Sequence, residues 1–334
     1  MGLSFAALGR SGGVARPRPS SSEAAQGVYV TVEDLAALEA SARDFTFARK
    51  QAVHRILAGR HASQVRGRGL AFEELREYLP GDDVRTIDWR VTARTGKPFV
   101  RVYDEEKDRP ALIVVDQRMN MFFGSRERMK SVAAAEAAAL SAWRIMELGD
   151  RVGGFVFNDS RIDELRPHRS REAVIGLAGA IARQNAELSA DSNTPRGSGQ
   201  LDLVLEKVAN VAVHDHLVIV FSDFEGHGAR TRDLLLRLTI SNDVLAVLVY
   251  DPFLLDLPGT TNVVVSGGKL QIELPLGHAP TRSGIAEFAR RRGEEFNAWQ
   301  QELGLPMLLL STAEVTAPQL RRLLGQLAWR QRRR

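Results

Sequence analysis

The sequence predicts an α/β protein with a doubly wound, mostly parallel sheet, preceded by a charged and turn-rich segment. Continuously apolar runs at 111–115, 216–222 and 243–250 are typical of strands that are buried on both faces. Segments with helical spacing separate these runs. Strands that alternate with helices in this way predict helices on both faces of a parallel sheet.

The other elements follow from shorter signals. Further strands are expected at 99–103, 152–157, 262–265, 270–274 and 306–310, with a Gly267-Gly268 turn joining the third and fourth of these. Thr31 is a typical N-cap, and Glu33 and Asp34 favour a helix start after it. Helices are expected over residues 32–40, 45–58, 125–148, 171–184, 201–213, 229–239, 279–303 and 316–329.

Composition limits the function classes. The chain has 334 residues, no cysteine and a net charge of +4, which is small for this length. The absence of cysteine excludes disulfides, thiolate metal sites and thiol nucleophiles, and fits a cytoplasmic protein. No apolar run approaches the ~20 residues that a membrane span needs, and the first residues lack the apolar core of a signal peptide. We therefore expect a cytoplasmic protein that binds neither membrane nor nucleic acid, unless its basic tail does so.

Composition also suggests how the chain is divided. Residues 1–28 are rich in Gly, Ser, Pro, Ala and Arg without hydrophobic periodicity, which predicts a disordered tail. Residues 29–109 are expected to hold N-terminal helices and the charged segment. Residues 110–329 are expected to form the sheet domain, and 330–334 (RQRRR) a basic tail.

Two of the expected strands end in aspartate, Asp116 and Asp223. Ligands of such sheets bind at the carboxyl ends of the strands, so these carboxylates converge if the strands are neighbours. Paired carboxylates suit a hard divalent cation such as Mg²⁺ or Mn²⁺. The alternative is structural, because aspartate also favours turns and helix caps directly after a strand.

The segment 66–109 is the most distinctive part of the chain, with ten acidic and ten basic residues among aromatic residues and turns. It resembles the bacterial domain-of-unknown-function 58 family, and the residues after it resemble a von Willebrand factor A-like, Rossmann-like domain. The resemblance covers roughly residues 45–325. Its ordered motif consists of Gly67-Arg68-Gly69, Phe72-Glu73, Arg76, Tyr78, Pro80, Gly81, Asp82, Asp83, Arg85, Ile87-Asp88-Trp89 and Ala93-Arg94.

The resemblance implies an A-type domain that often carries a metal-ion-dependent adhesion site. It also implies a protein partner, a MoxR-type AAA+ ATPase, in chaperone-like or complex-assembly work. The metal motif of A-domains reads Asp-x-Ser-x-Ser, with a later Thr and a final Asp. Asp116 and Asp223 match the two aspartates.

The match to the metal motif is incomplete. Arg118 and Asn120 replace the two serines, and Gln200 or Ser198 stands near the place of the threonine. Arg118 brings a permanent cation to the place of a small hydroxyl ligand. We therefore expect a degenerate site in which Arg118 pairs with Asp116 or Asp223 and no cofactor binds. If a metal binds, Asp116, Asn120 and Asp223 are its candidate ligands.

Two interpretations of the charged motif stay open and are compatible. Its arginines and aspartates are expected either to form an ion-pair network that ties the segment to the sheet domain, or to contact a partner. Trp89 is expected to be a core anchor, although an exposed Trp would suit an interface.

Three functions remain. The first is a non-catalytic protein-interaction module without a small-molecule substrate. No phosphate-binding loop, dinucleotide fingerprint or nucleophile elbow is present to favour an enzyme. The second is a metal-dependent hydrolase that uses Asp116 and Asp223 together with Asp82 and Asp83. The third is a protein that reaches membrane or nucleic acid through residues 330–334.

Overall fold

The computed structural model describes residues 27–43, 70–80, 82–105, 110–189, 199–254, 262–266, 271–275 and 279–332. The chain divides into two compact units, a smaller one at Arg60–Asp108 and a larger one formed by the rest. Several expectations lie outside the described residues: the tail before residue 27, the helix at 45–58, Gly67 to Gly69, Gly81, Ser198, the Gly267-Gly268 turn and the last two arginines.

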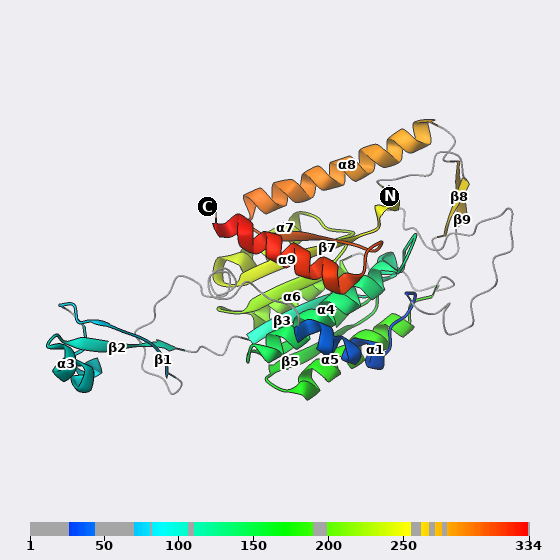
Figure 1. Ribbon diagram of the computed structural model, residues 1–334. Coiled ribbons are helices and arrows are strands. Elements are labelled where there is room, and N and C mark those ends of the chain that lie inside the picture. The colour runs from blue at the N-terminus through cyan, green and yellow to red at the C-terminus, as the bar shows by residue number, and fades with distance from the viewer. Residues whose placement is uncertain are drawn as a thin grey trace. The chain divides into compact units, whose positions relative to one another are not determined.

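The larger unit is built on a six-stranded sheet with the order β10-β7-β6-β3-β4-β5 (Figure 1). Five strands are parallel, and β5 pairs antiparallel with β4 at one edge. The strands are β3 (Pro110–Asp116), β4 (Arg151–Phe157), β5 (Ile162–His168), β6 (Leu217–Ser222), β7 (Asp243–Tyr250) and β10 (Met307–Ser311). The doubly wound, mostly parallel sheet predicted from the sequence is therefore confirmed.

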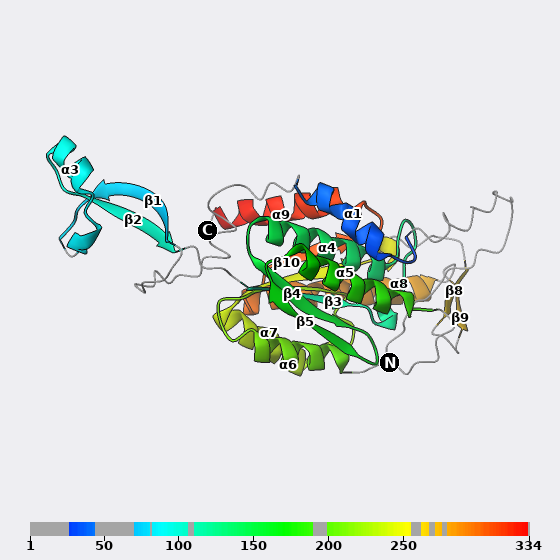
Figure 2. The ribbon, with the colours of Figure 1, turned by 90° about the horizontal axis from the view of Figure 1, so that it is seen from below.

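Helices cover both faces of this sheet (Figure 2). One face packs against α1 (Val32–Arg43), α4 (Lys130–Glu147), α5 (Arg171–Ala186) and α9 (Thr316–Arg332). The other face packs against α6 (Gln200–Val211), α7 (Ala229–Ser241) and α8 (Ala279–Glu302). Within β3 the two faces alternate, because Ile113 belongs to the first core and Leu112 to the second.

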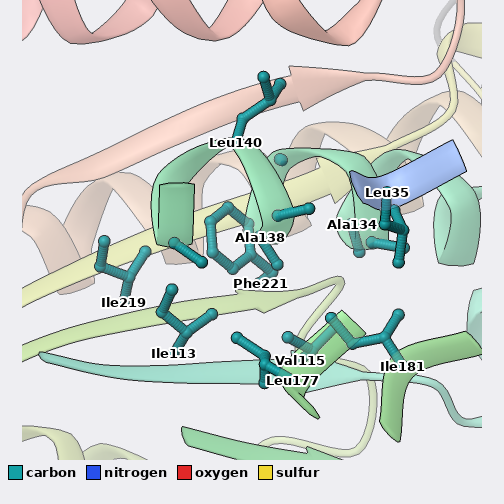
Figure 3. Packing of buried hydrophobic residues seen from close by; sticks show 14 of the residues in the cluster. Leu35, Ile113, Val115, Ala134, Ala138, Leu140, Leu177, Ile181, Ile219 and Phe221 are labelled. Atoms are coloured by element: carbon teal, nitrogen blue, oxygen red, sulfur yellow. The ribbon is translucent and has the colours of Figure 1, made fainter. Parts of the chain in front are cut away.

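The first core owes its packing to an alanine-rich helix. In α4 seven alanines are buried, and small side chains let a helix lie close to the sheet beneath it. Figure 3 shows Ala134 and Ala138 of α4 in the same cluster as Leu35 of α1 and Phe221 of β6. This packing fixes the position of Lys130, the first residue of α4.

The remaining elements of the larger unit are short. A hairpin joins β8 (Asn262–Ser266) to β9 (Gln271–Pro275), and two single-turn 3-10 helices follow strands, η2 (Met119–Met121) after β3 and η3 (Pro252–Leu254) after β7. Within the described ranges, no helix combines the length and the apolar character that crossing a bilayer requires.

The smaller unit is a two-stranded antiparallel ribbon with two short helical turns. Strand β1 (Leu70–Glu77) pairs with β2 (Phe99–Glu105), and between them lie η1 (Val84–Thr86) and α3 (Trp89–Thr95). The chain enters this connection through a turn in which the Asp82 amide donates to the Leu79 carbonyl at 3.0 Å. Gly96 ends α3 in the left-handed conformation, at φ 74°, which glycine adopts without strain.

Two expectations about these elements need correction. The helix near residue 32 was grouped with the charged segment, but α1 packs on α4 and α5 of the larger unit, because Leu35 is buried in its first core. Helix α4 begins at Lys130 and not at 125, since Met129 before it is extended, at φ −72° and ψ 153°. Strands β1 and β5 were not expected at all.

Candidate functional site

The candidate site lies where β3 and β6 end side by side at the carboxyl edge of the sheet. The two strands pair in parallel, so Asp116 at the end of β3 comes next to Ser222 and Asp223 at the end of β6. All three side chains are buried. The two aspartates were expected to converge if their strands are neighbours. In the structure β3 and β6 are neighbours, and their ends bring Asp116 and Asp223 to the same edge of the sheet.

Arg118 lies directly against Asp116. Its Nη2 is 2.7 Å from Oδ2 and its Nε is 3.0 Å from Oδ1, which is the two-pronged geometry that a guanidinium forms with a carboxylate. Its Nη1 donates to the carbonyl of Glu225 at 3.0 Å, and its guanidinium lies 5.4 Å from the Phe157 ring centre. The Arg118 side chain is only 5% exposed.

Asp116 also accepts bonds from its neighbours. The hydroxyl of Ser222 donates to Oδ2 at 2.6 Å, and the main-chain amide of Arg118 donates to Oδ1 at 3.0 Å. Burial lowers the pKa of Arg118, but the adjacent Asp116 outweighs burial, so that the pKa of this guanidinium is raised above its ordinary value. The pair is therefore a buried ion pair in which both oxygens of the carboxylate accept hydrogen bonds.

Asp223 has a second set of partners. Asn120 Nδ2 donates to Oδ1 at 2.6 Å, and Lys130 Nζ lies 2.6 Å from Oδ2. Burial raises the pKa of Asp223, but the charges of Lys130 and Arg118 outweigh it and hold the pKa at about 2. Asp223 is consequently ionised at neutral pH and neutralised by cations of the protein itself.

Helix α8 closes one side of the site. Arg292 donates from Nη2 to the carbonyl of Asp223 at 2.7 Å and pairs through Nη1 with Glu225 at 2.9 Å. One turn further, Glu295 lies 2.8 Å from Nε2 of His227. The end of β6 is thus bound by a helix that begins about sixty residues later in the chain.

A third strand also ends in an aspartate. Asp251 follows β7, and its carboxylate accepts from the Thr312 hydroxyl at 2.6 Å and from the Ser125 amide at 2.8 Å. The amide of Phe253 donates to it as well, at 2.9 Å. These bonds join the loops after β3, β7 and β10, so Asp251 has a structural role.

Gln200, one of two residues expected near the place of the metal-binding threonine, forms its hydrogen bond away from Asp116 and Asp223. Gln200 donates to the carbonyl of Asp159 at 3.3 Å, and the Asp159 carboxylate accepts from the Met119 amide at 2.7 Å. Ser198, the other candidate, lies outside the described residues. The bond of Gln200 therefore places it with Asp159 rather than with Asp116 or Asp223.

These contacts do not fit a divalent cation. Among the side chains that the structure describes, no three of the types His, Cys, Asp and Glu lie close enough together to hold a metal ion. The guanidinium of Arg118 lies where a ligand hydroxyl is expected, and Lys130 occupies the free oxygen of Asp223. A metal would have to displace both cations before either carboxylate could bind it.

The charged motif of the smaller unit is partly an ion-pair network. Arg76 pairs with Asp82 through two bonds, of 2.8 and 2.7 Å, and the Leu79 amide donates to Asp82 at 2.8 Å. The bond from Arg76 lowers the pKa of Asp82. Tyr78 is half-buried, and its amide donates to the Pro98 carbonyl at 2.8 Å, which continues the β ribbon beyond β1. Pro80 lies between these residues in the turn.

The other two aspartates of the motif cap helices. Asp83 accepts from the Arg85 amide at 3.0 Å at the start of η1. Asp88 is buried and accepts from the amides of Arg90 and Val91 at 3.0 and 3.1 Å at the start of α3. Both satisfy main-chain donors that a helix start leaves without an internal partner.

The prediction that Trp89 is a core anchor is wrong. Its side chain is 69% exposed, because the capping geometry of Asp88 turns the first residue of α3 outward. Arg85 and Arg94 are also exposed. The described arginines of the motif therefore divide into one that pairs with an aspartate, Arg76, and two that face solvent.

Three residues of the site were not predicted from the sequence: Lys130, Ser222 and Arg292. Ser222 precedes Asp223 and lies at the end of the same apolar run, so a signal was available. Lys130 and Arg292 are 93 and 69 positions from Asp223, and no short motif connects them to it.

The comparison with protein families matches this chain to a model described as "Protein of unknown function DUF58", over residues 74–295. The match spans more than half of the chain. The chain belongs to this family. The DUF58 match begins in β1 of the smaller unit and ends in α8, so it includes the charged motif from Arg76 onward and the whole candidate site. The description of the family names no activity.

The names of the curated relatives state no activity either. The uncharacterized proteins Rv1480 of Mycobacterium tuberculosis and Mb1516 of Mycobacterium bovis are each 27% identical to this DUF58 chain over 277 residues. The aligned part covers 82% of this chain and 85% of each relative. The similarity therefore extends over both units.

Two solved structures from Bacteroides species resemble part of the chain. One is the conserved hypothetical protein BatB of Bacteroides thetaiotaomicron, with 13% identity and a TM-score of 0.38. The other is an aerotolerance-related membrane protein of Bacteroides fragilis, with 12% identity and a TM-score of 0.35. Each match covers 66% of this chain and 99% of the other. Scores at this level carry no argument about function.

Proposed function

We propose that this DUF58 chain is a non-catalytic protein-interaction module, with an adhesion-type site in which protein cations take the place of the metal. The partner that the family resemblance suggests is a MoxR-type AAA+ ATPase, in chaperone-like or complex-assembly work in the cytoplasm. The observation that carries the proposal is the Arg118–Asp116 pair at 2.7 Å.

The geometry of the rim supports this function over a metal-dependent hydrolase. Two-metal hydrolases need several free carboxylates around ions that are about 4 Å apart. Asp116 and Asp223 each bond a cation of the protein, and Asp82 and Asp83 bond within their own segment. A rim of this kind is preorganised without a cofactor, which suits a rigid docking surface better than a reaction centre.

The absence of a bound metal is tested by calorimetric titration of the purified chain with Mg²⁺ and with Mn²⁺. We expect no heat of binding from the native chain. An Arg118→Ser, Lys130→Ser double variant removes both cations and restores a hydroxyl, and is expected to gain affinity for Mn²⁺. Micromolar binding by the native chain that Asp116→Ala abolishes would overturn this part of the proposal.

The partner is tested by adding purified MoxR-type ATPases of the source organism to the immobilised chain. We expect one of them to bind, and the complex to survive EDTA because no metal takes part. As a matched control, the chain carrying Arg118→Met should bind less, since its rim is no longer held in place. Failure of every such ATPase to bind the native chain would remove the ATPase from the proposal.

A further inference from the structure

The smaller unit exposes apolar side chains of unusual size for so few residues. Trp89, Leu79 and Val84 are 69%, 59% and 58% exposed. Single exposed apolar residues are normal on protein surfaces, so their number alone decides nothing. The position of Trp89 on α3 is more informative, because the helix carries arginines next to the indole.

Helix α3 has a distinct outward side. With 3.6 residues per turn, Trp89 and Ala93 form one row and Arg90 and Arg94 form the adjacent row. All four are exposed, whereas Val91 and Thr92 on the opposite side are half-buried. We call the four exposed residues the α3 face: an indole, a small residue that leaves it accessible, and two guanidinium groups.

The sequence around the α3 face is rich in basic residues. Between Val84 and Lys97 there are four basic residues and one acid, Asp88, which is buried as the N-cap of α3. Lys97 pairs with Glu77 at 3.0 Å. Among the described residues, Arg85, Arg90 and Arg94 form no ion pair. The face therefore combines a large apolar group with net positive charge.

We propose that the α3 face docks an acidic protein segment that carries a large apolar side chain. Guanidinium groups bind carboxylates through paired hydrogen bonds, and Trp and Arg are the residues most enriched at the energetic centres of protein interfaces. The assignment rests on the proposed interaction function and deepens it, because it names the surface and the chemistry of the partner.

A protein partner fits better than a nucleic acid. Stacking on Trp89 and phosphate binding by arginine would also suit single-stranded nucleic acid. However, the unit at Arg60–Asp108 contains ten acids and ten bases, so it has no net positive charge with which to attract a polyphosphate chain. The two exposed arginines of α3, Arg90 and Arg94, lie about one turn apart, which suits a short acidic segment.

The test is fluorescence anisotropy of a short labelled peptide of alternating glutamate and leucine, titrated with the full chain. We expect binding that weakens as salt is raised, a loss of about tenfold in affinity for Trp89→Ser, and no binding for the Arg90→Glu, Arg94→Glu variant. A lysine–leucine peptide and a single-stranded oligonucleotide are expected not to bind.

Matched controls come from the larger unit. Ile240→Ser removes an apolar side chain that is 76% exposed on α7, and Arg322→Glu reverses an exposed arginine on α9; both should leave peptide affinity unchanged. Circular dichroism establishes that each variant is folded.

Four outcomes would refute the α3 face as the docking surface: no binding of the acidic peptide, equal binding by Trp89→Ser, equal binding of the lysine peptide, or tighter binding of the oligonucleotide. These outcomes are separate from the proposed function. An ATPase that still binds the Trp89→Ser chain leaves the interaction function intact and rejects only the α3 face. A peptide that binds through the α3 face while no ATPase binds rejects only the ATPase.

Discussion

Arginines at the sheet rim and arginines on the α3 face have opposite surroundings. Arg118 is 5% exposed and bonds a carboxylate and a carbonyl, whereas Arg90 and Arg94 are exposed and form no ion pair among the described residues. An arginine is thus part of the folded core in the larger unit, whereas the arginines of α3 in the smaller unit are accessible to a partner.

The difference follows from what the neighbouring acids do. At the rim, Asp116 and Asp223 keep their charges buried and must be paired, because an unpaired buried carboxylate is costly. In the smaller unit, Asp83 and Asp88 accept from main-chain amides at helix starts, and Arg85, Arg90 and Arg94 form no ion pair among the described residues. An arginine therefore stabilises the fold where a buried carboxylate accepts its guanidinium, as Asp116 does for Arg118.

The largest effect is expected from Arg118→Met. The change leaves Asp116 buried without its cation, and breaking a buried pair in this way costs about 3–5 kcal/mol. Urea unfolding measures it. Arg94→Met is the matched control and should change stability by less than about 0.5 kcal/mol. Equal effects of the two substitutions would contradict the contrast between buried and exposed arginines.

A smaller loss of folding stability is expected at acidic pH. The pKa of Asp223 is about 2 in the fold against an ordinary value of 3.8, so the ionised form is favoured by folding. This corresponds to about 2 kcal/mol that is present above about pH 4 and is lost as the pH falls towards 2. Urea unfolding across this range measures the loss.

Lys130→Met tests the cause of the shift in the pKa of Asp223. Without Lys130 the pKa of Asp223 should rise, and the loss of stability should begin at a higher pH. Asp223→Asn should remove this component of the pH dependence. If the profiles of native chain and Lys130→Met coincide, Lys130 does not hold the charge of Asp223.

Asp88→Ala should cost about 1 kcal/mol, because two amides of α3 lose their acceptor. Hydrogen exchange at Arg90 and Val91 measures the loss directly, as faster exchange. Asp88→Ser retains an acceptor and should preserve most of the protection. Unchanged exchange in Asp88→Ala would show that the α3 face does not depend on this cap.

The smallest effect on stability is expected from Trp89→Ala, below about 0.5 kcal/mol, because the indole is exposed. Trp143 is its matched control: it is 2% exposed, its indole donates to the Leu35 carbonyl at 3.0 Å, and Trp143→Ala should cost about 3–5 kcal/mol. Thermal unfolding compares the two. Similar losses would mean that Trp89 is a packing residue after all.

The apolar strands of the sheet were predictable from sequence, and the polar ones were not. Strands β3, β6 and β7 are continuous apolar runs because helices cover both of their faces. Strand β5 is an edge strand with the sequence IDELRPH, and its half-buried and exposed positions do not form an apolar run. Strand β1 (LAFEELRE) contains three glutamates, which hid its strand character.

The candidate site was predictable only in part. Asp116, Arg118, Asn120 and Asp223 follow strand ends, where short motifs are visible. The third strand that ends in aspartate, at Asp251, carries the same signal and was overlooked. Lys130 and Arg292 reach Asp223 from α4 and α8, so their role depends on helix packing, which a single sequence does not display. Likewise, nothing in the sequence shows which side of a two-turn helix such as α3 faces outward.

The chemistry of β5 has a consequence for self-association. Pro167 has no main-chain hydrogen to offer, and the pairing of β5 with β4 is irregular around it. Asp163, Glu164 and Arg166 place charged side chains along the rest of the strand. A border of this kind discourages a neighbouring molecule from extending the sheet. The other border of this six-stranded sheet is β10, where Leu309 is 52% exposed, so main-chain pairing between copies is more favourable there than along β5.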